Sequence, residues 1–306
     1  MSRFAAIDVG TNSVLLLVAE RDARGHWVAV AERSDITRLG KGVDQTRRLS
    51  PESLDATLKA VERYAQEARE LGAKQIVVSA TSAARDATNG KDFIDGAKQR
   101  AGVDVEIISG AEEARLSFAS AHADFGGSQP LVVLDIGGGS TEFIFGSPSG
   151  EITFRHSFDV GAVRLTERHL HTDPPSQAEL QEIEQTLTKS FSTLPRPPAG
   201  FRMIGVAGTV TTLAAVAHHV EPYDPALIHG SRITLDEVSA TFQRLASLPT
   251  HLRKTVPGLQ PRRADVIVAG ALVFRAAMRT VGVAEATVSD RGLRWGLLAD
   301  RFGASK

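Results

Sequence analysis

The sequence contains no cysteine, which excludes disulfides, thiolate zinc sites, iron–sulfur clusters and cysteine nucleophiles. It also has no apolar run near the ~18 residues that a membrane-spanning helix needs. The apolar N-terminus is interrupted by Asp8 and is more typical of a strand than of a signal peptide. We therefore expect a cytoplasmic protein with no membrane partner.

Neither sign of charge is in excess, since 35 Lys and Arg face 36 Asp and Glu for a net charge of -1. This balance excludes a broadly basic surface that coats nucleic acid, and we expect no nucleic-acid partner. It leaves room for a local basic pocket that binds an anion. The 306 residues, 42% of them hydrophobic, suffice for two globular domains at ~150 residues each.

A strand–turn–strand pattern occurs twice in the chain. Apolar runs at 4–7 and 14–18 flank one turn, and apolar runs at 131–134 and 143–145 flank another. Aligning Asp8 with Asp135 also aligns two glycines and two serines of the turns, namely Gly10 with Gly137 and Ser13 with Ser140. The offset from 8 to 135 is 127 residues, about the size of one domain, and indicates a duplicated domain.

Helix and strand signals alternate after each copy, which favours an α/β fold with partly parallel sheets. We expect helices at 51–71, 92–101, 109–123, 163–170, 178–191, 210–219, 235–245, 264–279 and 293–301, and strands at 75–79, 103–108, 202–207 and 286–288. The turn-rich stretch 124–129 is the best domain boundary and predicts domains at 1–124 and 125–306. The last helix, at 293–301, could pack back on the first domain.

The strongest local signal is the run Asp-Ile-Gly-Gly-Gly-Ser-Thr-Glu at 135–142. Three glycines after a buried strand let backbone N–H groups converge on an anion such as phosphate. Asp135 at the strand end suits a hard cation such as Mg2+, and Glu142 lies across the same turn, where it can complete the site. The alternative is a plain glycine-rich hairpin. The run is neither a Walker loop, since it lacks the lysine, nor a Rossmann loop, since a strand follows.

The copy at 8–13 is weaker alone, because Asn12 and Ser13 form turns without any ligand. Paired with the later copy it predicts the facing wall of a cleft. Two further strand ends carry polar turns at 80–86 and 205–209. There the Arg85 guanidinium can donate two hydrogen bonds to phosphate oxygens. The N–H groups that open a helix at Gly208 and Thr209 can bind an anion. A surface arginine capped by a neighbour and a bare helix cap are the alternatives.

Residues 109–115 contain two adjacent glutamates. Ser109 and Glu112 have the spacing of a capping box, which gives Glu112 a structural role and leaves Glu113 free. Glu113 shares a small polar helix face with Ser117 and Ser120, where a carboxylate can hold a water as general base. A surface glutamate is the alternative.

Basic residues also cluster in two loops, which we interpret as solvated faces that could extend an anion track: Arg38, Lys41, Arg47, Arg48, Arg253, Lys254, Arg262 and Arg263.

Together the motifs at 8–13, 135–142 and 205–209 resemble the duplicated-domain superfamily of sugar kinases, heat-shock chaperone ATPases and actin. Within it, residues 80–86, 109–115 and 135–142 look like the exopolyphosphatase and guanosine pentaphosphate phosphohydrolase (Ppx/GppA) family. The resemblance runs from Phe4 to about Leu298. It implies two duplicated actin-like, ribonuclease H-like domains with mixed sheets flanked by helices and an active site in the cleft between them.

The resemblance also implies roles for individual residues. By motif match Glu113 carries the catalytic base, and Asp8, Asp135 and Glu142 are the acidic residues expected at Mg2+, or Mn2+ in its place. The positions expected to contact phosphate are Gly10, Thr11, Asn12, Ser13, Thr81, Arg85, Gly138, Gly139, Ser140, Gly208 and Thr209. A homodimer is expected on the same ground.

The sequence therefore predicts an exopolyphosphatase that releases terminal orthophosphate from inorganic polyphosphate with Mg2+ and a water activated by Glu113. Guanosine pentaphosphate (pppGpp) is the alternative substrate, so that polyphosphate or (p)ppGpp is the expected small-molecule partner. An ATP-dependent kinase and a non-catalytic nucleotide-sensing module are further alternatives.

Overall fold

The computed structural model describes residues 2–303, and its contacts group into two compact units. The first unit holds residues up to 116 together with those from 293 onward, and the second holds residues 117–292. We predicted a boundary after residue 124, whereas the contacts divide within helix α5 (Gly110–Phe125). The residues of α5 beyond Leu116 pack with the second unit, which a turn-based boundary does not anticipate.

The first unit is built on a five-stranded mixed sheet in the order β3-β2-β1-β4-β5. Its strands are β1 (Arg3–Val9), β2 (Ser13–Arg21), β3 (Trp27–Ile36), β4 (Ala73–Ala80) and β5 (Val105–Ile107). The first three are antiparallel neighbours, while β4 and β5 run parallel to β1. The carboxyl ends of β1, β4 and β5 therefore lie at one edge of the sheet, with the loops that follow them.

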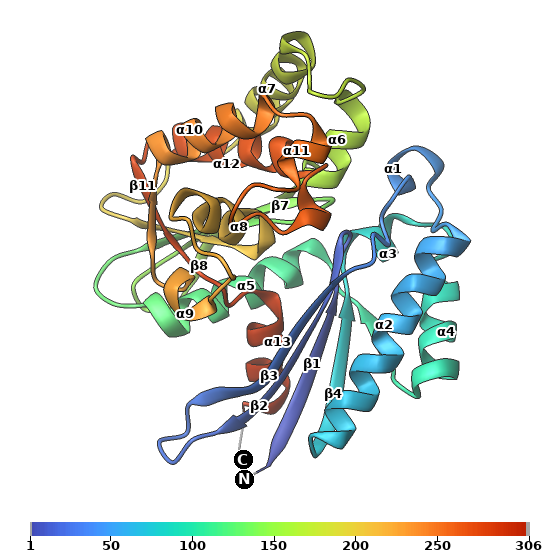
Figure 1. Cartoon of the computed structure of the whole chain (residues 1–306). Helices are drawn as coiled ribbons and strands as arrows, with labels where there is room; N and C mark the ends of the chain where they lie inside the picture. The colour runs from blue at the N-terminus through green and yellow to red at the C-terminus, as the bar shows by residue number, and fades with distance from the viewer. Residues whose placement is uncertain (1, 304–306) are drawn as a thin grey trace. The chain divides into compact units, whose positions relative to one another are not determined.

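Both faces of this sheet are covered, because successive strand residues point to opposite sides. Ala5, Ile7 and Val9 of β1 pack with α2 (Pro51–Glu70) and α4 (Gly90–Ala101). Ala6, on the other face, lies in a second cluster with α13 (Leu293–Phe302). Figure 1 shows α2 and α4 on one side of the sheet and α13 on the other. The short helices here are α1 (Val43–Thr46) and α3 (Ser82–Asp86).

The second unit has a six-stranded mixed sheet in the order β10-β11-β9-β6-β7-β8. Its strands are β6 (Leu131–Ile136), β7 (Thr141–Gly146), β8 (Ile152–Phe158), β9 (Arg202–Val206), β10 (Arg232–Thr234) and β11 (Glu285–Val288). Strands β6, β9 and β11 are parallel, and β6–β7–β8 form an antiparallel meander like β1–β2–β3. The alternation of strands and helices that the sequence predicts is confirmed, as is the α/β class with two mixed sheets flanked by helices.

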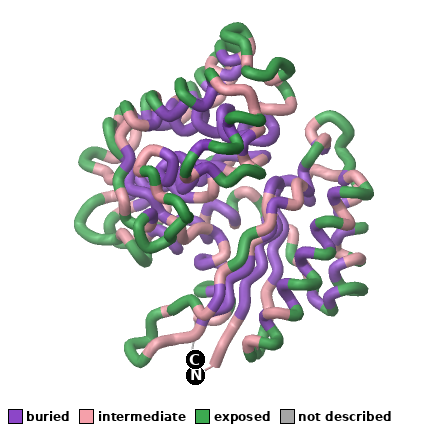
Figure 2. Tube along the Cα trace, viewed as in Figure 1, coloured by how far each residue is buried: buried purple, intermediate pink, exposed green. Residues whose placement is uncertain are grey.

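Helices cover the second sheet, whose buried strands are visible in Figure 2. They are α6 (Ala162–His169), α7 (Gln177–Phe191), α8 (Ala207–Ala217), α9 (Pro225–Ile228), α10 (Leu235–Ala246), α11 (Thr250–Arg253), η1 (Pro261–Arg263) and α12 (Ile267–Val281). Phe143 centres an aromatic cluster, with ring centroids 5.9 Å from Phe158 and 5.0 Å from Phe191. Phe118 of α5 packs beneath Gly146, where a Cβ would lie 2.0 Å from its ring.

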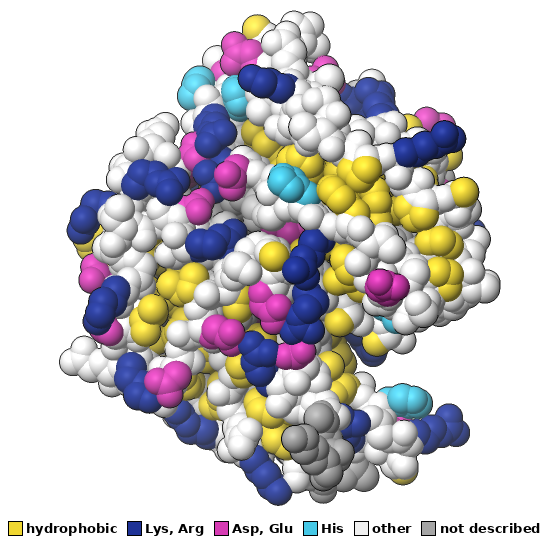
Figure 3. All heavy atoms as spheres, turned by 180° about the vertical axis from the view of Figure 1, so that it is seen from behind, with side chains coloured by type: hydrophobic (Ala, Val, Ile, Leu, Met, Phe, Trp, Pro, Cys, Tyr) yellow, Lys and Arg dark blue, Asp and Glu magenta, His cyan; other side chains and the backbone are white. Residues whose placement is uncertain are grey.

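The surface carries both signs of charge. On the face drawn in Figure 3, Lys and Arg side chains alternate with Asp and Glu, as the near-neutral net charge requires. In the described part of the chain, no helix has the length and apolarity to cross a membrane.

Removing the Phe143 ring should create a cavity at the centre of the aromatic cluster. We expect Phe143→Ala to lower the free energy of unfolding by about 3–5 kcal/mol. Val28→Ala is the control: Val28 is 46% exposed, and its truncation should change the free energy by less than ~0.5 kcal/mol. Urea unfolding followed by circular dichroism measures both, and equal effects would contradict the packing described.

Candidate active site

The glycine loop at 137–140 in the second unit is shaped to present backbone amides. Gly137 N donates to Ser140 O at 3.0 Å, and the carbonyls of Gly137 and Gly138 accept from the first amides of α6. The Gly139 carbonyl accepts from Arg164 Nε at 2.7 Å. Because N–H and C=O point in opposite directions across a trans peptide, the amides of residues 138–140 face away from α6. Within residues 2–303 these three amides donate no hydrogen bond, and converging amides of this kind bind anions.

The loop at 10–12 in the first unit repeats the design. Gly10 N donates to Ser13 O at 2.9 Å, the Thr11 carbonyl accepts from Gly40 N, and the Asn12 carbonyl accepts from two amides at 37–38. Over the described range of the chain, the Thr11 and Asn12 amides donate to no other group. Thr11 Oγ1 lies 2.7 Å from Ser82 Oγ, which ties this loop to the start of α3. The duplication inferred from sequence therefore extends to the hydrogen bonding of the two turns.

A third set of amides opens helix α8 directly after β9. No side chain caps this helix, and Ala207 has φ of 70°, a left-handed conformation that is uncommon for a residue with a Cβ. Such strain is often found at functional sites. Since β9 runs parallel to its neighbour β6, residues 207–209 and the glycine loop lie at the same sheet edge. An uncapped helix N-terminus attracts an anion through its N–H groups and dipole.

Arg263 supplies a positive charge beside this helix end. A Cβ on Gly208 would lie 2.4 Å from Arg263 Nη1 and Nη2, so the guanidinium packs directly on the glycine. Burial lowers the pKa of Arg263, which still leaves a cation at neutral pH. No carboxylate of residues 2–303 is within ion-pair distance of it. We interpreted its cluster as a solvated face that could extend an anion track, and the structure packs the Arg263 guanidinium against Gly208, a predicted phosphate position.

Two buried carboxylates lie under the glycine loop. Asp135 of β6 and Glu142 of β7 are register partners, which places their side chains on the same face of the sheet. Ser117 Oγ donates to Asp135 Oδ2 at 2.6 Å, and Ser157 Oγ donates to Glu142 Oε1 at 2.6 Å. Burial raises the pKa of Asp135, and the Ser117 hydroxyl acts in the opposite direction.

This pair fits a hard divalent cation. All its donors are oxygens, and Mg2+ commonly takes one or two carboxylates beside water and substrate phosphate. The described residues contain no group of three or more His, Asp or Glu that could hold a metal by themselves. Asp8 is buried at the equivalent place in the first unit, but its register partner there is Leu15. Asp135 and Glu142, two of the three predicted metal residues, thus lie side by side within the second unit.

Glu113 lies in the first turn of α5, in the first unit, and is 8% exposed. Its Oε2 is 3.5 Å from Arg85 Nη1, and the same nitrogen donates to Ile108 O at 2.9 Å. The sequence leaves Glu113 free of the capping role, with a surface glutamate as the alternative; the fold buries its carboxylate and pairs it with Arg85. The two residues come from α5 and α3, so the pairing depends on tertiary structure that spacing cannot reveal.

Glu112 has a structural role, as predicted, but by a different contact. Ser109 Oγ accepts from Glu112 N at 3.2 Å, which is the backbone half of the capping box. The Glu112 carboxylate instead accepts two hydrogen bonds from Arg115, which also lowers its pKa, and Arg115 reaches Asp300. Thr81 occupies the N-cap position of α3 without a side-chain cap bond.

The basic clusters divide in the structure. Lys41, Arg47, Arg48, Lys254 and Arg262 are exposed, as expected for solvated faces. For Arg253 the expectation is wrong, because its side chain is among the largest fully buried ones.

The model of one protein family, the Ppx/GppA phosphatase family, matches residues 17–304, nearly the whole chain. The protein belongs to the Ppx/GppA phosphatase family. It is therefore a hydrolase, and the two-domain actin-like fold expected from the motifs is confirmed by solved structures of the family.

Relatives of this Ppx/GppA protein cover its whole length. Exopolyphosphatase 2 of Mycobacterium tuberculosis is 38% identical, and the match covers 99% of each chain. The crystal structure of the Aquifex aeolicus family member is 32% identical with a TM-score of 0.83, covering 98% of this chain and 97% of that one. An exopolyphosphatase structure from Cytophaga hutchinsonii is 26% identical with a TM-score of 0.88 over 99% of both.

The raised pKa of Asp135 gives a testable pH dependence. Because the folded state holds the proton more tightly than the unfolded chain, the wild type loses stability as pH rises from about 4 through the folded pKa. We expect Asp135→Asn to raise the free energy of unfolding at pH 8 and to lose this gain near pH 4. Urea unfolding from pH 4 to 8 in EDTA measures it. Asp104→Asn, at a carboxylate that is 88% exposed, is the control and should show no such trend.

Proposed function

We propose that this phosphatase is an exopolyphosphatase, which hydrolyses the terminal phosphoanhydride bond of inorganic polyphosphate. The observation that carries the proposal is the set of unpaired amides at 138–140, beside the buried pair Asp135 and Glu142. Such a site suits a phosphoryl group with its cation. The full-length relative at 38% identity, itself named an exopolyphosphatase, supports the choice of substrate.

In the proposed reaction a water attacks the terminal phosphorus, and the bridging P–O bond breaks. Glu113 accepts a proton from the water, orthophosphate is released, and the shortened polyphosphate departs with the bridging oxygen. Arg85 holds the Glu113 carboxylate from one side, which restricts its orientation. Phosphoryl transfer needs mainly positioning and electrostatic stabilisation, which fixed amides provide without reorganisation.

Asp135 and Glu142 would hold Mg2+, or Mn2+ in its place, and the cation would offset charge on the phosphate oxygens. Ser117 and Ser157 fix one oxygen of each carboxylate. The amides at 138–140 and 208–209, with Arg263, bind the phosphate oxygens. The positive potential is thus local, and a net charge of -1 is compatible with a polyanionic substrate.

The general-base role is tested by phosphate release from polyphosphate with Mg2+. We expect Glu113→Gln to lower kcat at least about 100-fold, since general-base catalysis contributes roughly that factor or more. Glu112→Gln is the matched control, because the neighbouring carboxylate pairs with Arg115 and should keep kcat within about threefold.

Equal rates for wild type and Glu113→Gln would contradict the role of Glu113. Parallel assays on pppGpp decide between the two substrates: a kcat/KM higher for pppGpp would overturn the polyphosphate assignment. Phosphate transfer that requires ATP and an acceptor would instead indicate a kinase.

The cation site is tested through a residue that does not contact the metal. Ser157→Ala removes the hydrogen bond to Glu142 Oε1. We expect it to raise the Mg2+ concentration for half-maximal activity about tenfold, as for other groups that orient metal ligands. Ser149→Ala, in the turn between β7 and β8, is the control. Unchanged Mg2+ dependence in Ser157→Ala would contradict the placement of the cation at Glu142.

A further inference from the structure

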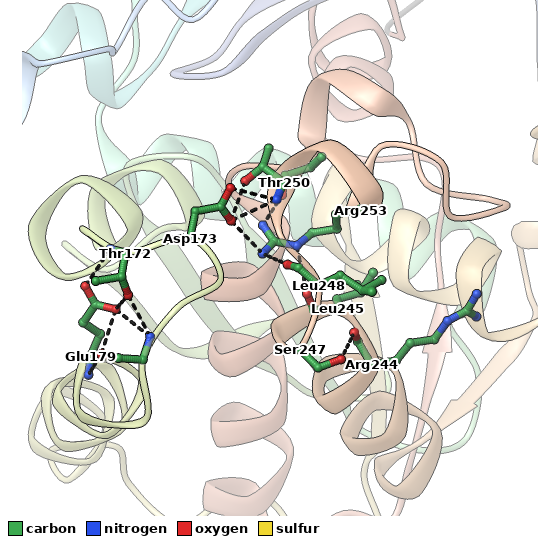
Figure 4. Close-up of polar contacts among 11 residues, drawn as sticks. Thr172, Asp173, Glu179, Arg244, Leu245, Ser247, Leu248, Thr250 and Arg253 are labelled. Atoms are coloured by element: carbon green, nitrogen blue, oxygen red, sulfur yellow. Dashed lines mark hydrogen bonds and ion pairs between the residues drawn. The ribbon is translucent and has the colours of Figure 1, made fainter.

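Arg253, at the end of α11 in the second unit, is a buried cation that donates to three backbone carbonyls, two around the end of α10 and one just after η1. Its Nε donates to Leu245 O at 2.9 Å, Nη2 to Leu248 O at 2.7 Å, and Nη1 to Ala264 O at 2.6 Å. Only 1% of the residue is exposed. Figure 4 shows the Arg253 guanidinium beside Leu245, Leu248 and Asp173, whereas Arg244 of α10 points away from it.

Asp173 completes the arrangement from the loop between α6 and α7. Its carboxylate lies 3.8 Å from Arg253 Nη2 and accepts from Thr250 N at 2.9 Å and from Thr250 Oγ1 at 3.1 Å. The start and the end of α11 are therefore both held. The Asp173 side chain is half-exposed, so the carboxylate that faces the buried Arg253 is itself in contact with solvent.

A buried guanidinium is a costly way to fill space, because its charge loses hydration that an apolar side chain never needs. Burial lowers the pKa of Arg253, while Asp173 and Asp265 act in the opposite direction. What only arginine provides here is a planar fork with donors in three directions. These donors fix the end of α10 and the joint between η1 and α12 relative to one another.

Arg263 is the last residue of η1 and so lies at this joint between η1 and α12. The Ala264 carbonyl that Arg253 holds belongs to the residue next to Arg263, whose guanidinium packs on Gly208. Arg263 has one side-chain hydrogen bond of its own, from Nε to Gln260 Oε1 at 2.9 Å. That partner is an exposed glutamine three residues away, whereas the backbone next to Arg263 is held by a buried side chain through Ala264 O.

We propose that Arg253 is a positioning residue, which acts through the Ala264 carbonyl to hold the Arg263 guanidinium over the amides at 208–209. The inference rests on the proposed function, in which those amides bind a substrate phosphate. Arg253 touches no substrate, and its effect on activity passes entirely through Arg263.

The test is a double-mutant cycle on polyphosphate hydrolysis. Arg253→Lys keeps the charge but has a single donor atom, and we expect it to raise KM about tenfold while kcat changes less than about threefold. Arg263→Ala should raise KM at least as much. Combined with Arg263→Ala, Arg253→Lys should add no more than about twofold. Additive effects would show a general structural role and overturn the proposal. Arg244→Lys is the matched control.

Arg253→Lys is at risk of failing to fold, so Asp173→Asn provides a second variant. It leaves the three carbonyl contacts in place and removes the carboxylate's charge, and a smaller rise in KM is expected, about threefold. This rise should also vanish when Arg263 is alanine. A rise that persists without Arg263, or no rise at all, would count against the proposal.

A nuclear magnetic resonance readout separates this inference from the proposed function. The Arg263 Nε–H signal, assigned by its loss in Arg263→Ala, should shift and exchange faster with water in Asp173→Asn and Arg253→Lys, but not in Arg244→Lys. If the wild type hydrolyses neither polyphosphate nor pppGpp, the proposed function fails while this signal still reports on positioning. An unchanged signal in both variants would overturn the positioning role.

Discussion

The candidate site depends on the direction of a few peptide groups. In the loop at 137–140, helix α6 takes up the carbonyl oxygens, and the opposite N–H groups are left for a ligand. This requires close contact: Gly161 lies so near the loop that a Cβ there would be 2.5 Å from Gly138 O. The loop at 10–12 makes an equally close contact with Gly40, where a Cβ would clash with the Thr11 side chain. The amides left without a partner in these loops are therefore a product of backbone packing.

Around these amides the second unit combines charges that are unfavourable by themselves. Asp135 and Glu142 are buried carboxylates, and Arg263 is a cation with no carboxylate partner in the part of the chain that the structure describes. A phosphate with a divalent cation would satisfy both. Proteins commonly accept such unfavourable burial where a ligand completes the site.

Much of this could be predicted from the sequence, because turn chemistry is local. Glycine after a buried strand, an Asp at the strand end and a helix start after β9 all leave signals within a few residues. Contacts between distant segments leave none. Arg85 meets Glu113 across 28 positions, and Arg263 reaches Gly208 only through tertiary packing. Arg253 stands beside Lys254 in a charged pair that resembles a solvated surface, although the fold buries one and exposes the other. The unit boundary inside α5 was missed for the same reason, since an uninterrupted helix carries no turn signal.

The pairing of Asp8 with Leu15, against Asp135 with Glu142, has a consequence for the duplicated scaffold. Two equivalent halves would each pair two carboxylates across the first two strands of the repeat. Leu15 stands in the first copy at the place of Glu142 in the second, so the first copy lacks this carboxylate pair. The duplicated halves are therefore alike in backbone but not in side-chain charge: one hairpin pairs two buried carboxylates, and the other pairs a carboxylate with a leucine.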